Sequence, residues 1–174
     1  DKTMEVAFGA DCDTILLAEK YRNNQGEFLG TSCCPSWVMT ARAFFPDLAE
    51  NITDSYTPMV ETARKIKESD EEAKVIFIGP CIAKKFEALS DEMSGYIDHV
   101  LTFEELAALF VAFDIDLTTL KSESSINDAS TLGRGYANAG GVGKAIIRTA
   151  EKNFGITDIR FERADTLTDC REML

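Results

Sequence analysis

Basic side chains are scarce in this sequence: among its 174 residues, 18 Lys and Arg stand against 30 Asp and Glu, a formal net charge of −12. Binding to nucleic acid regardless of its sequence, or to an anionic membrane surface, requires an excess of cations, so the charge argues against both partners. Long apolar runs are absent too: no stretch approaches the roughly 20 residues of a membrane-spanning helix, and no signal peptide opens the chain. We therefore expect a cytoplasmic protein, whose acidic surface is compatible with a partner that carries a basic patch.

Cysteine and histidine are also few. The five cysteines are an odd number, which is unusual for the disulfide framework of a secreted protein, and two of them are adjacent. In a reducing cytosol, thiols are more often buried, catalytic or metal-binding than paired in disulfides. The single histidine, His99, lies in a strand-like pattern and is more typical of a structural residue than of a ligand. The candidates for chemistry are therefore the cysteines: Cys12, Cys33, Cys34, Cys81 and Cys170.

Short apolar segments alternate with longer helical patterns along the chain. Apolar and β-branched runs predict strands over residues 6–9, 27–31, 74–78, 96–101 and 156–161. Apolar periods of about 3.6 residues predict helices over 13–23, 36–45, 59–67, 103–113 and 140–153, and one more that ends at Leu89. The polar, Ser-rich segment 121–132 is predicted to be a loop.

This alternation is typical of βαβ units, so we expect an α/β fold with a parallel sheet and helices on both faces. With 45% hydrophobic and 28% charged residues, the composition is that of a globular protein. We expect residues 1–174 to form a single domain. Because the chain begins without methionine at Asp1 and stops within an amphipathic pattern at Leu174, we also expect a fragment of a longer protein.

The first motif with chemical potential is Thr-Ser-Cys-Cys-Pro-Ser-Trp over residues 31–37. Pro35 stands where proline is favoured, at the first helical position, which makes Cys34 the N-cap. A thiol at a helix N-terminus is stabilised as the thiolate, the form that binds metals. Adjacent side chains diverge, so only one of Cys33 and Cys34 is expected to be a ligand. The alternative is a pair of small buried hydrophobic residues at the end of a strand.

The second motif is Gly-Pro-Cys-Ile-Ala-Lys-Lys-Phe-Glu-Ala over residues 79–88. Cys81, Lys84 and Glu87 are spaced by three, so they share one flank of a helix. That flank offers a soft metal ligand, a cationic hydrogen-bond donor and a carboxylate able to carry protons. The alternative is a solvated Lys–Glu face beside one buried cysteine. Both motifs follow predicted strands, and ligands of parallel sheets gather at the carboxyl ends of the strands.

Together, the motifs resemble a known family. Residues 31–37 resemble the first signature of iron-only (FeFe) hydrogenases, and Pro-Cys-Ile-Ala-Lys-Lys-Phe-Glu over 80–87 resembles the second, in the same order. The resemblance extends from about Glu5 to the C-terminus. It implies the large-subunit catalytic domain of an anaerobic oxidoreductase that converts two protons and two electrons reversibly to H2. It also implies a redox partner, such as ferredoxin or an accessory iron–sulfur domain.

The resemblance assigns metal ligands. Cys34 and Cys81 would be two of four thiolates that hold a 4Fe–4S cluster, which in the family is linked to a two-iron subcluster to form the H-cluster. The third signature, which supplies the other two thiolates, would lie beyond Leu174, and neither Cys12 nor Cys170 matches it. We therefore expect the cluster to be absent from the isolated chain, and the chain alone to be inactive.

The resemblance also assigns roles around the two-iron site. Cys33 would exchange protons with the amine of the bridging dithiolate, and Glu87 would lie near the pocket. Lys84 would hydrogen-bond a cyanide, and Tyr136 falls where the family often has an aromatic side chain that lines the pocket. The catalytic candidates are thus Cys33, Lys84 and Glu87, and the cofactor-binding candidates add Tyr136.

Three positions depart from the family pattern. Gly79 stands where many members have methionine. Leu17 and Lys20 stand where fast enzymes have the carboxylates of a proton relay, with Glu19 one position away, which favours a slower or sensory branch.

Three other functions stay open. A relative could keep the fold and a cubane for iron–sulfur assembly without hydrogen chemistry, although such relatives generally lack the paired cysteines and the Lys–Glu flank. The pair Cys33 and Cys34 could serve as a redox sensor. A phosphate loop over 138–145 fits poorly, because Asn138 and Ala145 replace the required glycine and hydroxyl residue.

Overall fold

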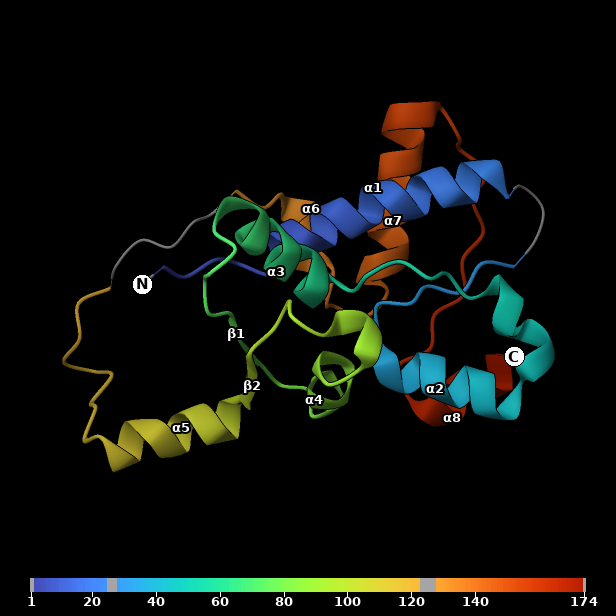
Figure 1. The fold of residues 1–174 in the computed structure, drawn as a ribbon. Coiled ribbons are helices and arrows are strands. Elements are labelled where there is room, and N and C mark those ends of the chain that lie inside the picture. The colour runs from blue at the N-terminus through green and yellow to red at the C-terminus, as the bar shows by residue number, and fades with distance from the viewer. Residues whose placement is uncertain (1, 25–27, 123–127, 174) are drawn as a thin grey trace.

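The computed structural model of the chain describes residues 2–24, 28–122 and 128–173 (Figure 1). Within these residues, the chain forms a mostly helical structure that includes a small parallel sheet. None of the helices described is both long and apolar enough to cross a membrane.

Helix α1 (Ala7–Asn23) packs against three other helices: α3 (Pro58–Ser69), α6 (Thr131–Gly135) and α7 (Gly141–Phe154). Figure 1 shows α7 crossing α1, while α6 and α3 lie toward the N-terminal end of α1. Helices from the two ends of the chain thus meet around α1. The remaining elements are α2 (Pro35–Phe44), η1 (Pro46–Asn51), β1 (Ile76–Gly79), α4 (Ala83–Ala88), η2 (Asp91–Met93), β2 (His99–Thr102), α5 (Phe103–Ala112) and α8 (Leu167–Met173).

Two glycines allow the helices around α1 to approach closely. A Cβ on Gly9 would lie 2.1 Å from the carbonyl oxygen of Pro58 at the start of α3. A Cβ on Gly133 in α6 would lie 2.4 Å from the carbonyl oxygen of Ala7. Neither distance is sterically possible, so both contacts require glycine. The close approach of α6 holds Tyr136, which follows it directly, against α1.

The sheet consists of β1 and β2, which pair in parallel with Ile76 opposite His99 and Gly79 opposite Thr102. The predicted α/β fold with a parallel sheet and covering helices is confirmed. The sheet has two strands in the described part of the chain, and a separate parallel bridge joins Gly30 to Ile52.

Buried apolar side chains form three groups. The first lies between α3 and the sheet, the second between α1 and α7, and the third beside Cys33. Their buried members are Met59, Val60, Ala63, Val75 and Ile97 in the first, Leu17, Ala18, Ile146 and Ala150 in the second, and Ala10, Tyr136 and Ala145 in the third.

Two predicted strands are wrong. Residues 7–9 of the expected strand 6–9 belong to α1, because Gly9 and Ala10 begin the buried face that α1 presents to its neighbours. Segment 156–161 forms no strand, since Ile156 and Ile159 pack instead against the core between α1 and α7. A short apolar run has the same local sequence pattern whether it forms a strand, belongs to a helix or packs on the core without regular structure.

Two other predictions are corrected in part. Within the expected strand 27–31, residue 27 lies outside the described residues, and Gly30 makes one isolated bridge. Within the expected loop 121–132, residues 123–127 lie outside the described residues, and α6 already begins at Thr131. The Ser130 hydroxyl accepts a hydrogen bond from the Gly133 N–H and so caps α6. This cap explains why the helix begins inside a segment whose polar composition predicts a loop.

Candidate functional site

The first cysteine motif forms a tight entry into α2. Cys34 is the N-cap residue, with an extended backbone, and Pro35 opens the helix, as predicted. The Cys34 thiol is exposed, whereas Cys33 is half-buried and packs against the group of Ala10, Tyr136 and Ala145. The two neighbours therefore have different surroundings. The alternative prediction, that both cysteines are buried hydrophobic residues, is wrong for Cys34.

Hydrogen bonds fix the backbone around this entry. The Trp37 indole N–H donates to the carbonyl oxygen of Thr31 over 3.0 Å. The Ser32 hydroxyl donates to the carbonyl oxygen of Ser55 over 2.8 Å and accepts from the Thr53 hydroxyl over 3.0 Å. The position of the cysteine pair is thus set by segments on both sides of it in the sequence.

The second motif follows β1. Gly79 ends the strand, and the exposed Cys81 comes two residues later, just before α4. The Lys84 backbone N–H donates to the Cys81 carbonyl over 3.2 Å, so Cys81 lies in the turn that opens the helix. The alternative of a buried cysteine is contradicted at this position.

Lys84 brings the two motifs together. Its ammonium group donates to the carbonyl oxygen of Cys33 over 3.3 Å and to the Glu87 carboxylate over 2.8 Å. The side chains of Lys84 and Glu87 are only 12% and 8% exposed. The alternative of a solvated Lys–Glu face is therefore wrong. Figure 1 shows α4 beside the beginning of α2, in line with the packing of these two helices.

The Cys33 thiol is held in its protonated form. Burial raises its pKa above the ordinary value, and the Asp13 and Cys34 charges act in the same direction. The Thr31 hydroxyl, 3.7 Å from the sulfur, and the Lys84 ammonium lower the pKa without reversing the shift. A neutral thiol beside a buried cation is suited to giving and taking a proton.

Tyr136, the aromatic side chain that the family resemblance indicates, packs in the same buried group as Cys33 and has an acidic neighbour that no motif indicates. The Tyr136 hydroxyl donates to Asp13 Oδ2, and the two side chains are 6% and 1% exposed. Burial raises the pKa of Asp13 to about 6, although the Tyr136 hydrogen bond opposes the shift. The signal available in the sequence was an acid on the face of α1 that also carries Ala10 and Leu17.

The remaining cysteines differ in position. Cys12 lies on α1 near Asp11 and Glu61, away from the two motifs. Cys170 lies on α8, which packs against α2, and the charge of Cys34 contributes to its raised pKa. Among the described residues, no three His, Cys, Asp or Glu side chains form a metal-binding group.

The donor set fits part of an iron–sulfur site. Cys34 and Cys81 present exposed thiols from the starts of two helices that pack together, and thiolates are the ligands that such clusters prefer. Two thiolates provide half of the usual set of four.

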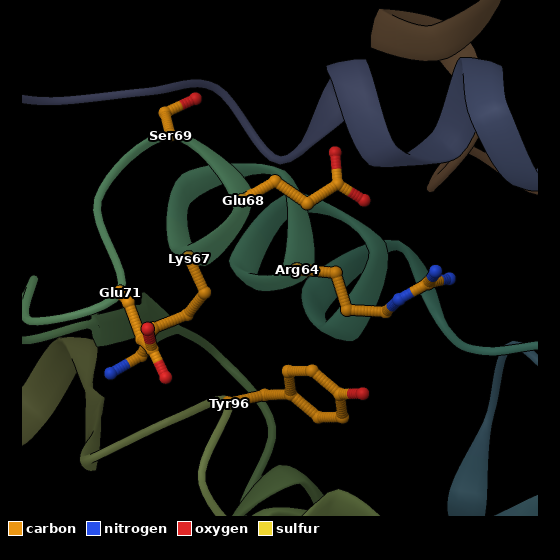
Figure 2. A pocket seen from close by; sticks show the side chains of 6 residues that line it. All are labelled: Arg64, Lys67, Glu68, Ser69, Glu71 and Tyr96. Atoms are coloured by element: carbon orange, nitrogen blue, oxygen red, sulfur yellow. The ribbon is translucent and has the colours of Figure 1, made fainter.

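A surface pocket lies elsewhere, beside the C-terminal half of α3. In Figure 2, Arg64 and Lys67 extend from α3 toward the side where Tyr96 lies. The pocket contains no sulfur and no member of the two motifs. The full lining is Arg64, Lys67, Glu68, Ser69, Glu71 and Tyr96.

Comparisons with known proteins agree with these features. Residues 1–173 match the family model described as the iron only hydrogenase large subunit, C-terminal domain. Iron hydrogenase 1 of Clostridium pasteurianum is 30% identical over 99% of this chain and 34% of its own length. The cytosolic Fe-S cluster assembly factor NAR1 of Kluyveromyces lactis is 30% identical over 62% of this chain and 23% of its own length.

The solved structure of a variant of the FeFe-hydrogenase HydA1 from Chlamydomonas reinhardtii superposes on this chain with a TM-score of 0.74 and 25% sequence identity. The superposed region covers 96% of this chain and 47% of the hydrogenase chain. The chain therefore spans about a third of the first of these relatives and about half of the solved structure.

Proposed function

The chain belongs to the family of iron-only hydrogenase large subunits, and from this premise we propose that it forms part of the catalytic domain that binds the H-cluster. The reaction is the reversible conversion of two protons and two electrons to H2. The observation that carries the proposal is the contact of Lys84 with the Cys33 carbonyl, because it joins both cysteine segments through a buried cation. A buried cation between thiol-bearing segments suits an anionic cluster.

Cys34 and Cys81 would hold the cluster as two of the four thiolates of a 4Fe–4S unit. When bound, the H-cluster would supply the redox-active iron centre for hydrogen chemistry. Both thiols are exposed, so a cluster can reach them without a change in the core.

Four side chains would serve the two-iron part of the site. Lys84 would offer its positive charge to an anionic ligand such as cyanide, and the Glu87 carboxylate accepts a hydrogen bond from its ammonium group over 2.8 Å. Cys33 remains a thiol and exchanges protons. Tyr136, which is 6% exposed, forms the apolar wall that keeps water from the Cys33 side.

Electrons come from a redox partner, such as ferredoxin or an accessory iron–sulfur domain. The net charge of −12 is compatible with a partner that presents a basic patch, and the acidic surface disfavours nucleic acid and anionic membranes as partners. A cytoplasmic, anaerobic setting suits this chemistry.

A second candidate is a non-catalytic role in iron–sulfur assembly or redox sensing. The similarity to the assembly factor NAR1 supports it. So do two positions on α1: Leu17 is fully buried in the core, and Lys20 pairs with Asp54, so neither offers the carboxylate of a fast proton relay.

The test compares Cys33→Ala with Cys34→Ala in the full-length, matured protein. Cys34→Ala should lose the cluster and all hydrogen evolution. Cys33→Ala should keep the cluster but lose about 10²-fold in rate, a typical effect for a positioned acid–base group. Cys33→Asp restores part of the rate if a carboxylate can take over. The measurements are iron content, sulfide content and hydrogen evolution.

Cys12→Ala is the matched control, because Cys12 lies outside the site and its replacement should leave iron and rate unchanged. Equal iron loss in both neighbours would refute the division of roles between Cys33 and Cys34. A matured protein with a cluster but no hydrogen evolution or uptake would favour the assembly or sensing candidate.

The chain by itself gives a second test. We expect it to retain little or no iron, because two thiolates are too few for a cubane that takes four. Stoichiometric iron and sulfide in the purified chain would contradict this expectation, and would make Cys12 and Cys170 candidates for further ligands.

A further inference from the structure

Asp13 is an acid in the interior of the molecule, on the face of α1 that meets α6. Its side chain is 1% exposed, and its Oδ2 accepts a hydrogen bond from the Tyr136 hydroxyl group. Its other oxygen, Oδ1, is buried and has no hydrogen-bond partner among the described residues. A buried carboxylate with one bare oxygen costs stability, because ionised acids are seldom buried without full pairing. The cost points to a use for the proton that this group can carry.

Tyr136 connects Asp13 to the cysteine pair. Its ring packs in the same buried group as Cys33, and the charges of Cys33 and Asp13 both raise the pKa of its hydroxyl. Burial is the largest cause of that rise, so Tyr136 stays protonated. A phenol hydroxyl can donate one hydrogen bond and accept another at the same time. It therefore stands between Asp13 and the Cys33 side as a group through which a proton can pass.

Charged groups on the neighbouring elements keep Asp13 able to change its protonation near neutral pH. From α3, Glu61 raises its pKa, while Lys20 on α1 and Lys84 on α4 lower it. From α7, the contacts around this region are apolar, through Ala145 and Ile146. Burial outweighs the attractive charges, and an acid with a pKa of about 6 can both hold and release a proton under physiological conditions.

We propose that Asp13 stores the proton that serves the Cys33 side of the site, and that the Tyr136 hydroxyl transfers it. What consumes the proton rests on the proposed hydrogen chemistry. In the transfer, protonated Asp13 donates its hydrogen bond to the Tyr136 oxygen, and Cys33 is a thiolate because the site has just consumed its proton. The Tyr136 hydroxyl proton then forms the S–H bond of Cys33 while the Asp13 proton passes to the Tyr136 oxygen. One O–H bond forms at Tyr136 as another breaks, Asp13 becomes a carboxylate, and no electron moves.

The first test needs no cluster. Infrared titration of the chain should show a buried carboxyl that loses its proton with a midpoint near pH 6. The signal should vanish in Asp13→Asn and persist in Asp158→Asn, which removes an exposed acid. In Tyr136→Phe the midpoint should move to higher pH, because the hydrogen bond that favours the carboxylate is lost. No titrating carboxyl between about pH 4 and 8, or an unchanged midpoint in Tyr136→Phe, would overturn the inference.

The second test uses the matured full-length protein. Asn at position 13 can still accept the Tyr136 hydrogen bond but cannot carry a proton, so it separates proton transfer from positioning. Asp13→Asn should keep its iron, lose tenfold or more in turnover, and lose the rate dependence near pH 6. Asp13→Glu should restore part of the rate, and Tyr136→Phe should resemble Asp13→Asn.

The outcomes distinguish this inference from the proposed function. Asp13→Asn with full iron, full rate and an unchanged pH profile overturns the relay and leaves the hydrogenase proposal standing. A wild-type protein without cluster or hydrogen turnover overturns the proposed function. In that case, infrared titration of the Asp13 carboxyl in the wild-type chain and in Tyr136→Phe still decides whether Asp13 and Tyr136 are coupled.

Discussion

Helices α1 and α5 differ in a way that their compositions do not predict. Helix α1 carries polar side chains on most of its surface, yet it buries six residues against α3, α6 and α7. Helix α5 is the more apolar, yet none of its residues is buried, and Val111 is 83% exposed. The contrast teaches that composition favours a helix, whereas burial depends on which distant segments pack against it. In α1, small residues such as Gly9 permit that packing.

The largest expected difference between the two helices concerns matched leucines. Leu17 of α1 is fully buried, whereas Leu109 of α5 is 40% exposed. Leu17→Ala should lower the free energy of unfolding by about 3 kcal/mol through lost burial and a cavity. Leu109→Ala should lower it by less than about 1 kcal/mol. Urea unfolding of both variants measures the difference, and equal losses would remove the contrast.

Two acids extend the comparison to pH. Asp13 on α1 has its pKa raised from 3.8 to about 6, mainly by burial. Its stabilising contribution is therefore fully present below pH 3.8 and is lost as the pH rises through about 6. The shift corresponds to a change on the order of 3 kcal/mol. Beside β1, the Val75 N–H and the Lys74 ammonium hold the pKa of Asp98 at about 2, so its contribution is lost as the pH falls from 3.8 toward 2.

The free energy of unfolding, measured against pH, checks these signs. In the wild type, titration of Asp13 should lower the free energy of unfolding as the pH rises from about 4 to 6, and Asp13→Asn should abolish this decrease. Titration of Asp98 should raise the free energy of unfolding as the pH rises from about 2 to 3.8, and Asp98→Asn should abolish this increase. Two difference curves with the same sign would show that burial does not dominate at Asp13.

Glycine packing gives a smaller effect. Gly9→Ala should cost about 2 kcal/mol, because the new methyl group overlaps the Pro58 carbonyl oxygen and pushes α1 from α3. Gly135, at the end of α6, has nothing within 4 Å of an added Cβ, so Gly135→Ala should change stability little. Thermal unfolding of the pair tests whether α1 depends on this contact. Full stability in Gly9→Ala would mean that the two helices separate freely.

The smallest effect concerns the cap of α5. The Glu105 N–H donates to the Thr102 hydroxyl over 3.2 Å, and the Thr102 N–H donates to the Glu105 carboxylate over 2.8 Å. Thr102→Ala should cost about 1 kcal/mol and speed amide hydrogen exchange in α5, while Thr102→Ser retains the hydroxyl and most of the protection. Unchanged exchange in Thr102→Ala would indicate that packing, rather than this local cap, holds α5.

Local signals in the sequence predicted much of this arrangement. Pro35 placed Cys34 at a helix cap, and the spacing of Lys84 and Glu87 placed them on one flank, because both features depend on neighbours within a turn. Segments 6–9 and 156–161 were misassigned for the opposite reason. The structure that a short apolar run adopts depends on which distant residues it packs against, as Ile156 and Ile159 pack against the core of Leu17 and Ile146. No local pattern in the sequence identifies those residues.

Two parts of the candidate site lay beyond sequence reasoning. Asp13 and Tyr136 are 123 residues apart, so their hydrogen bond exists only after α6 docks on α1. The Lys84 contact with the Cys33 carbonyl likewise requires α4 to reach α2. The cysteines and the lysine lie in the two motifs, and the family resemblance indicated the tyrosine. The acid gave no such signal, because an isolated aspartate on a helix has no motif.

The separation of Cys33 and Lys84 by 51 residues also has a consequence in time. At roughly 5–20 residues per second, a ribosome takes about 3–10 s to make the chain between them. Throughout that interval the first thiol pair has no lysine beside it, and exposed thiols are open to oxidation. Translation thus imposes an order: the thiol pair is made first, and the lysine contact can form only afterwards.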